Sequence, residues 1–95
     1  MTHIPKVVNC RFDLYDVYIG RPSKWGNPYS HMKESLAVFK VSNRREAIYK
    51  YEIWLKEQPK LMADLHELKG KVLGCWCAPK SCHGDVLLRL ANDNT

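Results

Sequence analysis

The fold is indicated most strongly by residues 71–90, which read KVLGCWCAPKSCHGDVLLRL. The apolar run 71–76 is typical of a buried strand, and the proline-containing segment after it is typical of a turn. From about Cys82 to Leu90, apolar side chains recur at the spacing of one helix face. This stretch therefore predicts a strand, a turn and a helix, the building pattern of an α/β domain.

Other strands are expected nearer the start of the chain. Residues 6–10 and 16–19 have the apolar character of short strands, and Gly20 ends the second of them. Residues 37–39 are a weaker candidate for a further short strand. We therefore expect a sheet of three or four strands.

Two more helices are expected between these strands and the final one. Asn43 and Glu46 have the spacing of a capping box, with Asn in place of the more usual Ser or Thr, and predict the start of a helix. Pro59 ends that helix and suits the first turn of another, which Gly70 ends.

The size of the chain agrees with one domain. With 95 residues, of which 45% are hydrophobic, it can bury one core. We expect residues 1–95 to form a single α/β domain with a core from about 5 to 91. Its helices pack on the sheet, and a Rossmann-like site lies where a strand ends and a helix begins.

The first residues lack the apolar run of a signal peptide, and no stretch approaches the roughly 18 apolar residues of a membrane span. We therefore expect a cytoplasmic protein with no membrane partner.

The chain has four cysteines, and three of them lie close together at Cys75, Cys77 and Cys82. Disulfide staples are usually spread along a chain, and no secretion signal is seen, so free thiols are the better interpretation. Cys10 stands apart near a strand, and we expect it to be a small buried hydrophobic residue.

The formal net charge of +5 is concentrated in the first half of the chain. From Met1 to Arg45 there are eight Lys or Arg against three Asp or Glu, whereas the remainder has seven of each sign. A locally basic segment favours an anionic partner such as a phosphate, a nucleotide or a nucleic acid. The alternative is a solvated surface with a modest positive balance.

Candidate chemistry lies at the junction of the last strand and the last helix. Strand alternation puts Cys75 and Cys77 on one face. Ser81 is expected to cap the helix, which places Cys82 and His83 in its first turn. A helix start attracts anions and lowers the pKa of a cysteine there, so Cys82 is predicted to be the reactive thiolate.

Three interpretations of this junction remain open. In the first it is a ligand pocket, in which His83 or Asp85 exchanges protons with a substrate while Ser81, Cys82 and backbone amides hold a phosphate or an oxyanion. In the second, His83 and Asp85 only cap the helix. In the third, a structural zinc has a tetrahedral set of ligands, namely Cys75, Cys77, Cys82 and His83. The spacing of these ligands departs from that of the usual zinc knuckles.

A second candidate segment is the loop of residues 20–28, which read GRPSKWGNP. The cations of Arg21 and Lys24 suit a phosphate or a carboxylate. The indole of Trp25 suits stacking on a base, and the amide of Asn27 suits a base or sugar edge. Its glycines would let the backbone approach a ligand closely. The ligand-binding candidates in this loop are Gly20, Arg21, Lys24, Trp25, Gly26 and Asn27. The alternative is that Trp25 closes the edge of the core. We expect both segments to line one cleft.

The same residues resemble an uncharacterised domain family of about this length from bacteriophages and bacteria. Its pattern is Y-x-G-R-x-S-x-W-G-N-P, then a central Y-x-x-W-L helix, then L-x-C-W-C-x-P-x-x-C-H-G-D-x-L. The resemblance runs from about Val7 to Leu90 and includes the whole motif from Cys75 to Asp85. It implies no particular reaction, because none is known for the family. The last motif also resembles the strand, loop and Cys-His helix start of another small uncharacterised α/β family, which favours a Rossmann-like pocket.

The sequence as a whole predicts recognition and processing of a nucleotide, a nucleoside phosphate or a nucleic-acid end. The expected reaction is hydrolysis or transfer at a phosphate or glycosidic bond, as in a nucleotide hydrolase or a glycosyl transferase or hydrolase. The alternative is a zinc-stabilised Cys₃His module that binds nucleic acid or protein, with zinc as its cofactor.

Overall fold

The computed structural model describes residues 5–30, 39–78 and 80–93. Its strands are β1 (Lys6–Asn9), β2 (Val17–Tyr18), β3 (Tyr29–Ser30), β4 (Phe39–Lys40) and β5 (Val72–Cys75). Its helices are α1 (Arg44–Lys56), α2 (Pro59–Asp64) and α3 (His83–Asn92), and a 3₁₀ helix, η1 (Leu65–Leu68), follows α2. Together they form the small α/β domain that the sequence predicts. No helix in the described part of the chain is long and apolar enough to span a membrane.

Three strands form a parallel sheet in the order β1-β5-β2. The central strand, β5, is buried along its whole length. Val7 of β1 and Val17 of β2 both pair with Leu73 of β5. Because the strands are parallel, their carboxyl ends meet at one edge, which is where open α/β sheets place their ligands. The three predicted strands are confirmed, with slightly shorter bounds.

A second, smaller sheet consists of β3 and β4, in which Tyr29 pairs with Phe39 in parallel. Of the weaker strand candidate at residues 37–39, Phe39 lies in β4, and residues 37 and 38 lie outside the described residues. Within the described residues the larger sheet has three strands, so the four-stranded alternative is not observed.

The helix α1 begins at the predicted capping box. Asn43 Oδ1 accepts a hydrogen bond from Glu46 N at 2.8 Å, and the Glu46 carboxylate accepts one from Ser42 N at 2.7 Å. Its buried face consists of Ala47, Tyr51 and Leu55.

The next helical segment is shorter in its α-helical part than the sequence predicts. Pro59 occupies the first turn of α2, as expected, but after Asp64 the chain tightens into η1. Gly70 then adopts a φ of 72°, in the left-handed region that favours glycine, and the helical segment ends.

The prediction that Ser81 caps α3 is wrong. The N-cap is Cys82, whose Sγ accepts a hydrogen bond from Gly84 N at 3.2 Å. Asp85 Oδ2 accepts a bond from Cys82 N at 3.2 Å, so the two side chains form a reciprocal capping box. The helix therefore starts at His83, and Ser81 stays exposed outside it.

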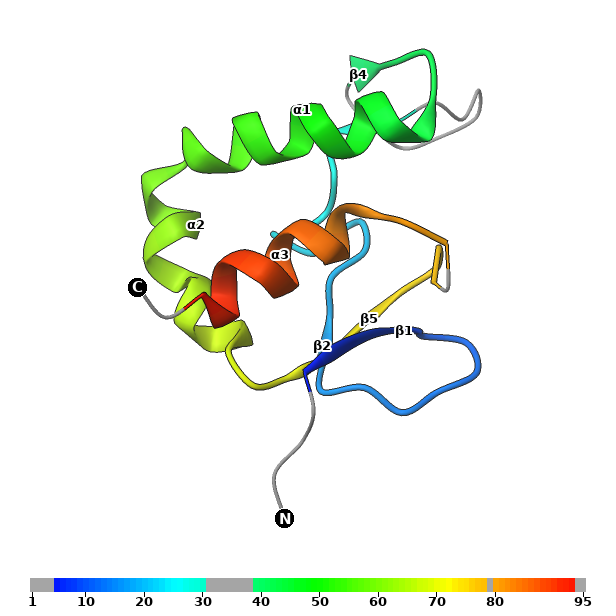
Figure 1. Cartoon of the computed structure of the whole chain (residues 1–95), viewed down its shortest axis with the longest axis vertical. Coiled ribbons are helices and arrows are strands. Elements are labelled where there is room, and N and C mark those ends of the chain that lie inside the picture. Colours follow the sequence, from blue (N-terminus) through cyan, green and yellow to red (C-terminus); the bar gives the residue numbers. More distant parts are fainter. Residues whose placement is uncertain (1–4, 31–38, 79, 94–95) are drawn as a thin grey trace.

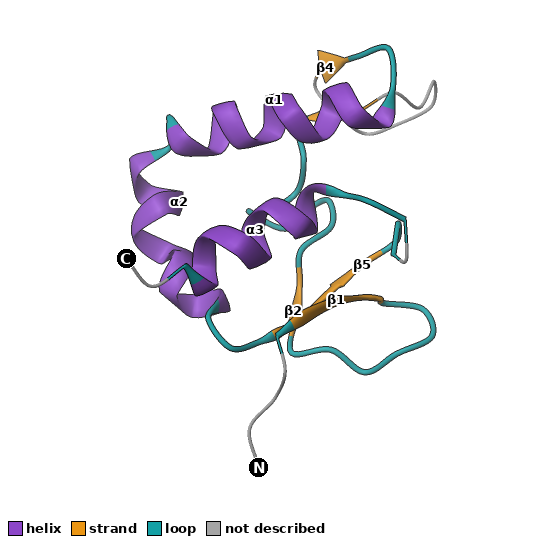
Figure 2. Ribbon diagram, viewed as in Figure 1, coloured by secondary structure: helices purple, strands orange, loops and turns teal. Residues whose placement is uncertain are grey.

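The molecule is layered, with α3 lying between the sheet and α1 (Figures 1 and 2). The approach of α3 to the sheet depends on Gly84, because a Cβ there would lie 2.8 Å from Ile19 Cδ1 and 3.0 Å from Val7 Cγ1. The core fills the space between these layers, and its largest fully buried side chains include Tyr51, Leu55, Leu73 and Leu87. The N-terminal end of α3 therefore lies beside the carboxyl ends of the strands.

Candidate functional site

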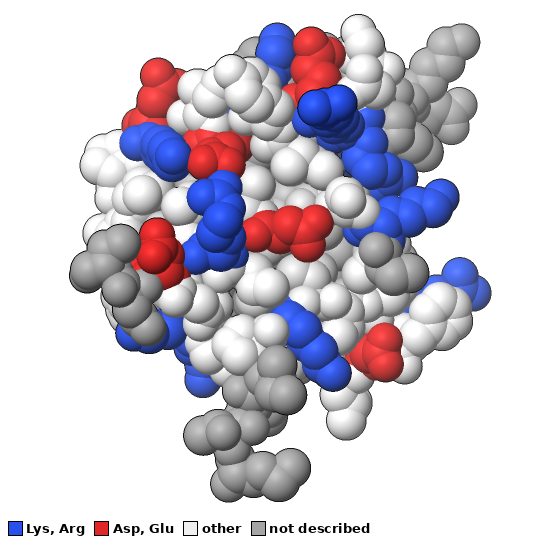
Figure 3. Space-filling model, in the orientation of Figure 1, with Lys and Arg blue, Asp and Glu red and all other residues white. Residues whose placement is uncertain are grey.

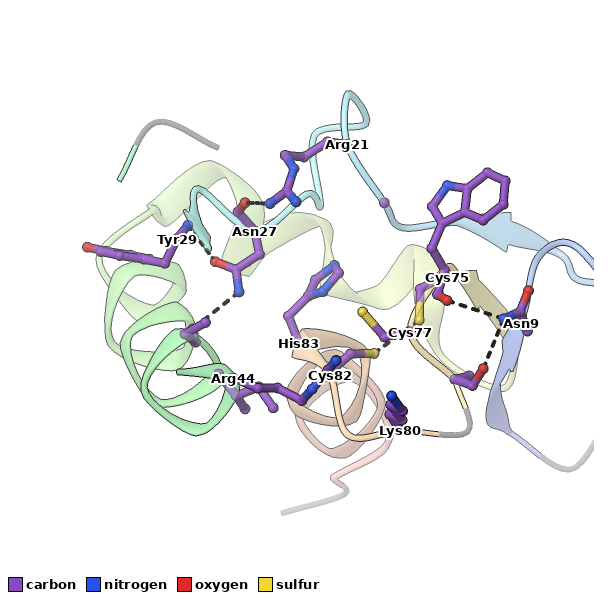
Figure 4. A pocket seen from close by; sticks show the side chains of 15 residues that line it. Asn9, Arg21, Asn27, Tyr29, Arg44, Cys75, Cys77, Lys80, Cys82 and His83 are labelled. Carbon is purple, nitrogen blue, oxygen red and sulfur yellow. Dashed lines mark hydrogen bonds between the residues drawn. The ribbon is translucent and has the colours of Figure 1, made fainter. Parts of the chain in front are cut away.

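A cavity of about 600 Å³ opens at the edge where the parallel strands end. Asn9 lines it at the end of β1, Cys75 at the end of β5, and Gly20 just after β2. Cys82 and His83 add the start of α3, and α1 closes another side (Figure 4). The two segments chosen from the sequence, 20–28 and 75–85, thus meet at one cavity although they are far apart along the chain.

The cavity wall is basic. Arg21, Arg44 and Lys80 line it, and no Asp or Glu is among its described lining residues. Arg21 is held by a hydrogen bond from its guanidinium to Asn27 O at 2.5 Å, and Arg44 donates to Ser81 O at 3.2 Å. In the space-filling view, Lys and Arg side chains gather over the end of the molecule where α1 and α3 begin (Figure 3). This distribution favours a negatively charged ligand.

Three thiols converge on one side of the cavity (Figure 4). The sulfur atoms of Cys75 and Cys82 are 3.1 Å apart, and the Cys77 thiol interacts electrostatically with both. Cys75 and Cys82 are buried, whereas Cys77 is partly exposed. All four cysteines, including the separate Cys10, are free thiols, as predicted. Cys10 itself is only partly buried.

The cluster determines which sulfur ionises first. Hydrogen bonds from Cys75 and Cys82, and then the contact with Arg44, hold the pKa of Cys77 well below its usual range. The interaction with Cys75, then that with Cys77, and then burial raise the pKa of Cys82. The prediction of a reactive thiolate on Cys82 is therefore wrong. The negative charge belongs on Cys77, because it alone combines two thiol donors with a guanidinium.

His83 joins the two segments through its ring. Its Nε2 lies 2.7 Å from Ile19 O, and its ring packs edge-on against Tyr51 with the ring centroids 4.9 Å apart. A carbonyl only accepts, so Nε2 carries the proton and Nδ1 of the neutral ring keeps its lone pair. Burial is the main cause that lowers the pKa of His83. The ring is therefore neutral at pH 7.

The geometry does not favour the zinc alternative. Among the described residues, no group of three or more His, Cys, Asp or Glu side chains is arranged to hold a metal ion. The sulfurs face one another at hydrogen-bond distance, while the Nε2 atom of His83 is directed to a backbone carbonyl.

Several candidates from the sequence lie away from the cavity wall. Trp25 is buried in the core with 2% of its surface exposed, and Tyr51 donates a hydrogen bond to its carbonyl at 2.7 Å. Lys24 forms ion pairs with Asp64 and Glu67 at 3.0 and 2.9 Å. The Trp25 ring thus packs inside the core, and the Lys24 ammonium group is paired with carboxylates of the protein.

Three other candidates, Gly26, Ser81 and Asp85, also lie outside the cavity wall and have structural roles or other surroundings. A Cβ on Gly26 would lie 2.9 Å from Arg21 Cγ, so this glycine lets the Arg21 side chain pack over the loop. Ser81 and Asp85 line a neighbouring hollow instead of the main cavity. The carboxylate of Asp85 accepts the capping bond from Cys82 N.

Asn27 lines the cavity, but its side-chain amide is hydrogen-bonded to backbone groups. Its Nδ2 donates to Ala47 O at 3.2 Å, and its Oδ1 accepts from Tyr29 N at 2.8 Å. The side chain therefore ties the loop to α1. This role positions the neighbouring Arg21 at the cavity.

Sequence reasoning missed several lining residues, among them Asn9, Arg44 and Trp76. Asn9 Nδ2 donates to Trp76 O at 3.2 Å and to Ala78 O at 3.0 Å, which connects β1 to the cysteine turn. Arg44 starts α1 and counted only toward the basic balance of the first half. Trp76 lines the cavity and is 62% exposed, and its place between Cys75 and Cys77, where strand alternation turns it from the core, is the sequence signal that could have marked it.

Comparison with known proteins gives relatives without a stated function. Residues 5–93 match a family described as a domain of unknown function, DUF4326. An "uncharacterized 12.4 kDa protein in nrdA-td intergenic region" of Enterobacteria phage T4 is 35% identical over 92 residues, covering 92% of this chain and 77% of that protein. An uncharacterised protein of Acanthamoeba polyphaga mimivirus is 34% identical over 95 residues, covering 88% of this chain and 68% of that protein. No solved structure matches the chain.

Proposed function

This chain belongs to the DUF4326 family, whose function is unknown, and we propose its function from the cavity. The protein binds a nucleotide or nucleoside phosphate there and processes it by hydrolysis or transfer at a phosphate or glycosidic bond. The observation that carries the proposal is a wall lined by Arg21, Arg44 and Lys80, with no carboxylate among the described lining residues. Such a wall selects an anionic ligand.

Phosphate is the anion that this wall suits best. A guanidinium donates parallel hydrogen bonds to two phosphate oxygens, and the bond from Arg21 to Asn27 O uses only part of its five donors. The start of α3 lies on the same wall at Cys82 and His83. The positive end of its dipole adds to the attraction for an anion.

The size and rim of the cavity support a nucleotide. A volume of about 600 Å³ is within the usual range of small-molecule sites. Trp76 lines the cavity with its side chain largely exposed, and its Nε1 donates to Tyr18 Oη at 3.0 Å, which fixes the indole. A base stacked on this indole, with its phosphate on the arginines, uses both features, whereas a phosphorylated sugar would use only one.

Cys77 supplies the nucleophile for processing. A phosphate bound by Arg44 would lie near the Cys77 sulfur, because both residues line the cavity and the guanidinium interacts electrostatically with the thiolate. The thiolate attacks phosphorus, so an S–P bond forms, and the bond from phosphorus to the leaving oxygen breaks; that oxygen takes a proton from water. A second water then attacks phosphorus, the S–P bond breaks, phosphate leaves and the thiolate is restored. This proximity favours reaction at the phosphate over the glycosidic bond.

Isothermal titration of the full chain with 5′-AMP at low salt tests the binding. We expect saturable binding that Arg21→Gln and Lys80→Gln each weaken about tenfold, since a hydrogen bond to a charged group is worth roughly 1.5–3 kcal/mol. Lys50→Gln is the matched control, because Lys50 is exposed on α1 and does not line the cavity.

Two results would overturn the proposed function. One is the absence of binding for all four common ribonucleoside monophosphates at low salt. The other is equal affinity in the wild type and in both cavity variants, which would place the ligand elsewhere on the molecule.

A further inference from the structure

The face of the sheet opposite α3 carries a strip of aromatic side chains. Leu73 and Cys75 of β5 point into the core, so Gly74 points to the opposite face. Tyr18 pairs in register with Gly74 and points the same way, since its neighbour Ile19 is in the core. In the described part of the chain, this face is spanned by the loop between β1 and β2 and not by a helix (Figures 1 and 2).

The rings of this strip follow one another; Tyr15 and Trp76 are exposed, and Tyr18 between them is partly buried. Tyr15 lies over Gly74, where a Cβ would come within 2.6 Å of its ring, and it remains 43% exposed. The Tyr15 and Tyr18 ring centroids are 6.4 Å apart, and the Tyr18 hydroxyl accepts the bond from Trp76 Nε1. We refer to Tyr15, Tyr18 and Trp76 as the aromatic strip.

The strip ends at the cavity. Trp76 belongs to both, and the Tyr18 hydroxyl donates to Arg21 O at 2.9 Å, beside the guanidinium that lines the cavity. The loop next to the outer end of the strip contains one cation, Arg11, and two carboxylates, Asp13 and Asp16. Attraction for phosphate is therefore concentrated at the cavity end, and the strip itself offers flat apolar surfaces.

We propose that the substrate class of this site is the phosphorylated end of a single-stranded nucleic acid, with the terminal nucleotide in the cavity and the adjacent bases stacked along the aromatic strip. This inference rests on the proposed function and extends it. Stacking on side-chain rings is tolerant of sequence, because every base has a flat face. A duplex end does not fit this arrangement, since its bases are already paired and stacked.

The same geometry assigns different roles to the rings. Trp76 lies at the cavity mouth and contacts the terminal base, so a mononucleotide uses it too. Tyr15 lies further along the strip and contacts only the next base. The gain in affinity from a mononucleotide to an oligonucleotide therefore depends on Tyr15.

Fluorescence and titration measurements on the full chain test this inference with four probes: 5′-AMP, a 5′-phosphorylated deoxyadenosine tetranucleotide, its 3′-phosphorylated isomer and a blunt duplex of the same length. We expect at least one tetranucleotide to bind about tenfold or more tightly than 5′-AMP, with quenching of tryptophan fluorescence. The duplex should show no such gain.

Variants of the strip separate the two roles. Tyr15→Ala should remove most of the tetranucleotide gain and leave 5′-AMP affinity unchanged, whereas Tyr15→Phe should retain the gain because the ring is kept. Trp76→Ala should weaken both ligands. Tyr49→Ala is the matched control, since Tyr49 is an exposed ring on α1, 67% accessible and outside the strip. Melting temperatures of all variants show whether they are folded.

The inference and the proposed function fail in different ways. If 5′-AMP binds but neither tetranucleotide binds more tightly, the inference is wrong and the proposed function stands. A gain that persists in folded Tyr15→Ala also overturns it, as does an equal gain for the duplex. If none of the probes binds, both are wrong, and the strip belongs to a surface of another kind.

Discussion

Replacing His83 by glutamine should change how the stability of the protein depends on pH. The ring is 8% exposed, and burial lowers its pKa from an ordinary value of 6.5. Above about pH 6.5 the histidine is neutral in both the folded and the unfolded chain. Below it, the unfolded chain takes up a proton that the folded chain refuses, so stability falls as pH falls toward the folded-state pKa.

The size of the effect follows from one proton and one hydrogen bond. Each pH unit in that window removes up to about 1.4 kcal/mol from the wild type. At pH 7 the variant should be less stable by roughly 1–3 kcal/mol, because the more flexible glutamine amide does not hold a donor as firmly against Ile19 O as the packed ring does at 2.7 Å. The two stabilities should therefore converge as the pH is lowered toward about 5, the wild type falling more steeply.

Urea denaturation at several pH values between about 5 and 7.5 measures both curves in the range where histidine titrates. His66→Gln is the control, because it removes an exposed histidine outside the cavity. Parallel curves for the wild type and His83→Gln would refute the account of a neutral, buried ring. If the stability of His66→Gln also converged with that of the wild type at low pH, the pH dependence of stability would not come from His83.

Other predictions concern the thiols, the core and the metal alternative. Iodoacetamide at about pH 6 should alkylate Cys77 faster than the separate Cys10, and equal rates measured by peptide mass spectrometry would contradict a stabilised thiolate. Tyr51→Phe should cost about 1–3 kcal/mol in urea denaturation, since the Trp25 carbonyl is left unpaired; a loss near zero would mean that water replaces the hydroxyl. Gly84→Ala should cost about 1–3 kcal/mol through crowding against the sheet, and an unchanged midpoint would show that α3 can move away. A chelator should leave the melting temperature unchanged, whereas a large drop would revive the zinc module.

The elements could be predicted because each has a local cause in the sequence. Asn43 and Glu46 identified the start of α1, and the apolar run around Leu73 identified β5. The strand order could not be predicted, since the pairing of β5 between β1 and β2 depends on contacts distant in sequence. The error at the start of α3 has a similar source: Ser81 is the stronger cap by local preference, but Cys82 is the residue that the packed helix turns toward Gly84 N.

The candidate site was predicted as two segments, but not as individual roles. Trp25 and Trp76 illustrate the difference, because the tryptophan proposed for stacking is buried in the core, whereas Trp76, for which the sequence predicted no role, is exposed at the cavity. The pKa of Cys77 is lowered by Cys75 and Cys82 and then by Arg44, which comes from α1 and is distant in sequence from the cysteines. Local patterns therefore located the two candidate segments, whereas long-range packing decided how each of their side chains is placed.

The central claim is that 5′-AMP occupies the cavity between the two segments. The most direct measurement is a titration of the ¹⁵N-labelled full chain with 5′-AMP at low salt, followed by backbone amide shifts. The account predicts that amides of residues 20–27 and 75–83 shift together with a single dissociation constant. Shifts confined to α2 and η1, or no saturable shifts at all, would contradict it.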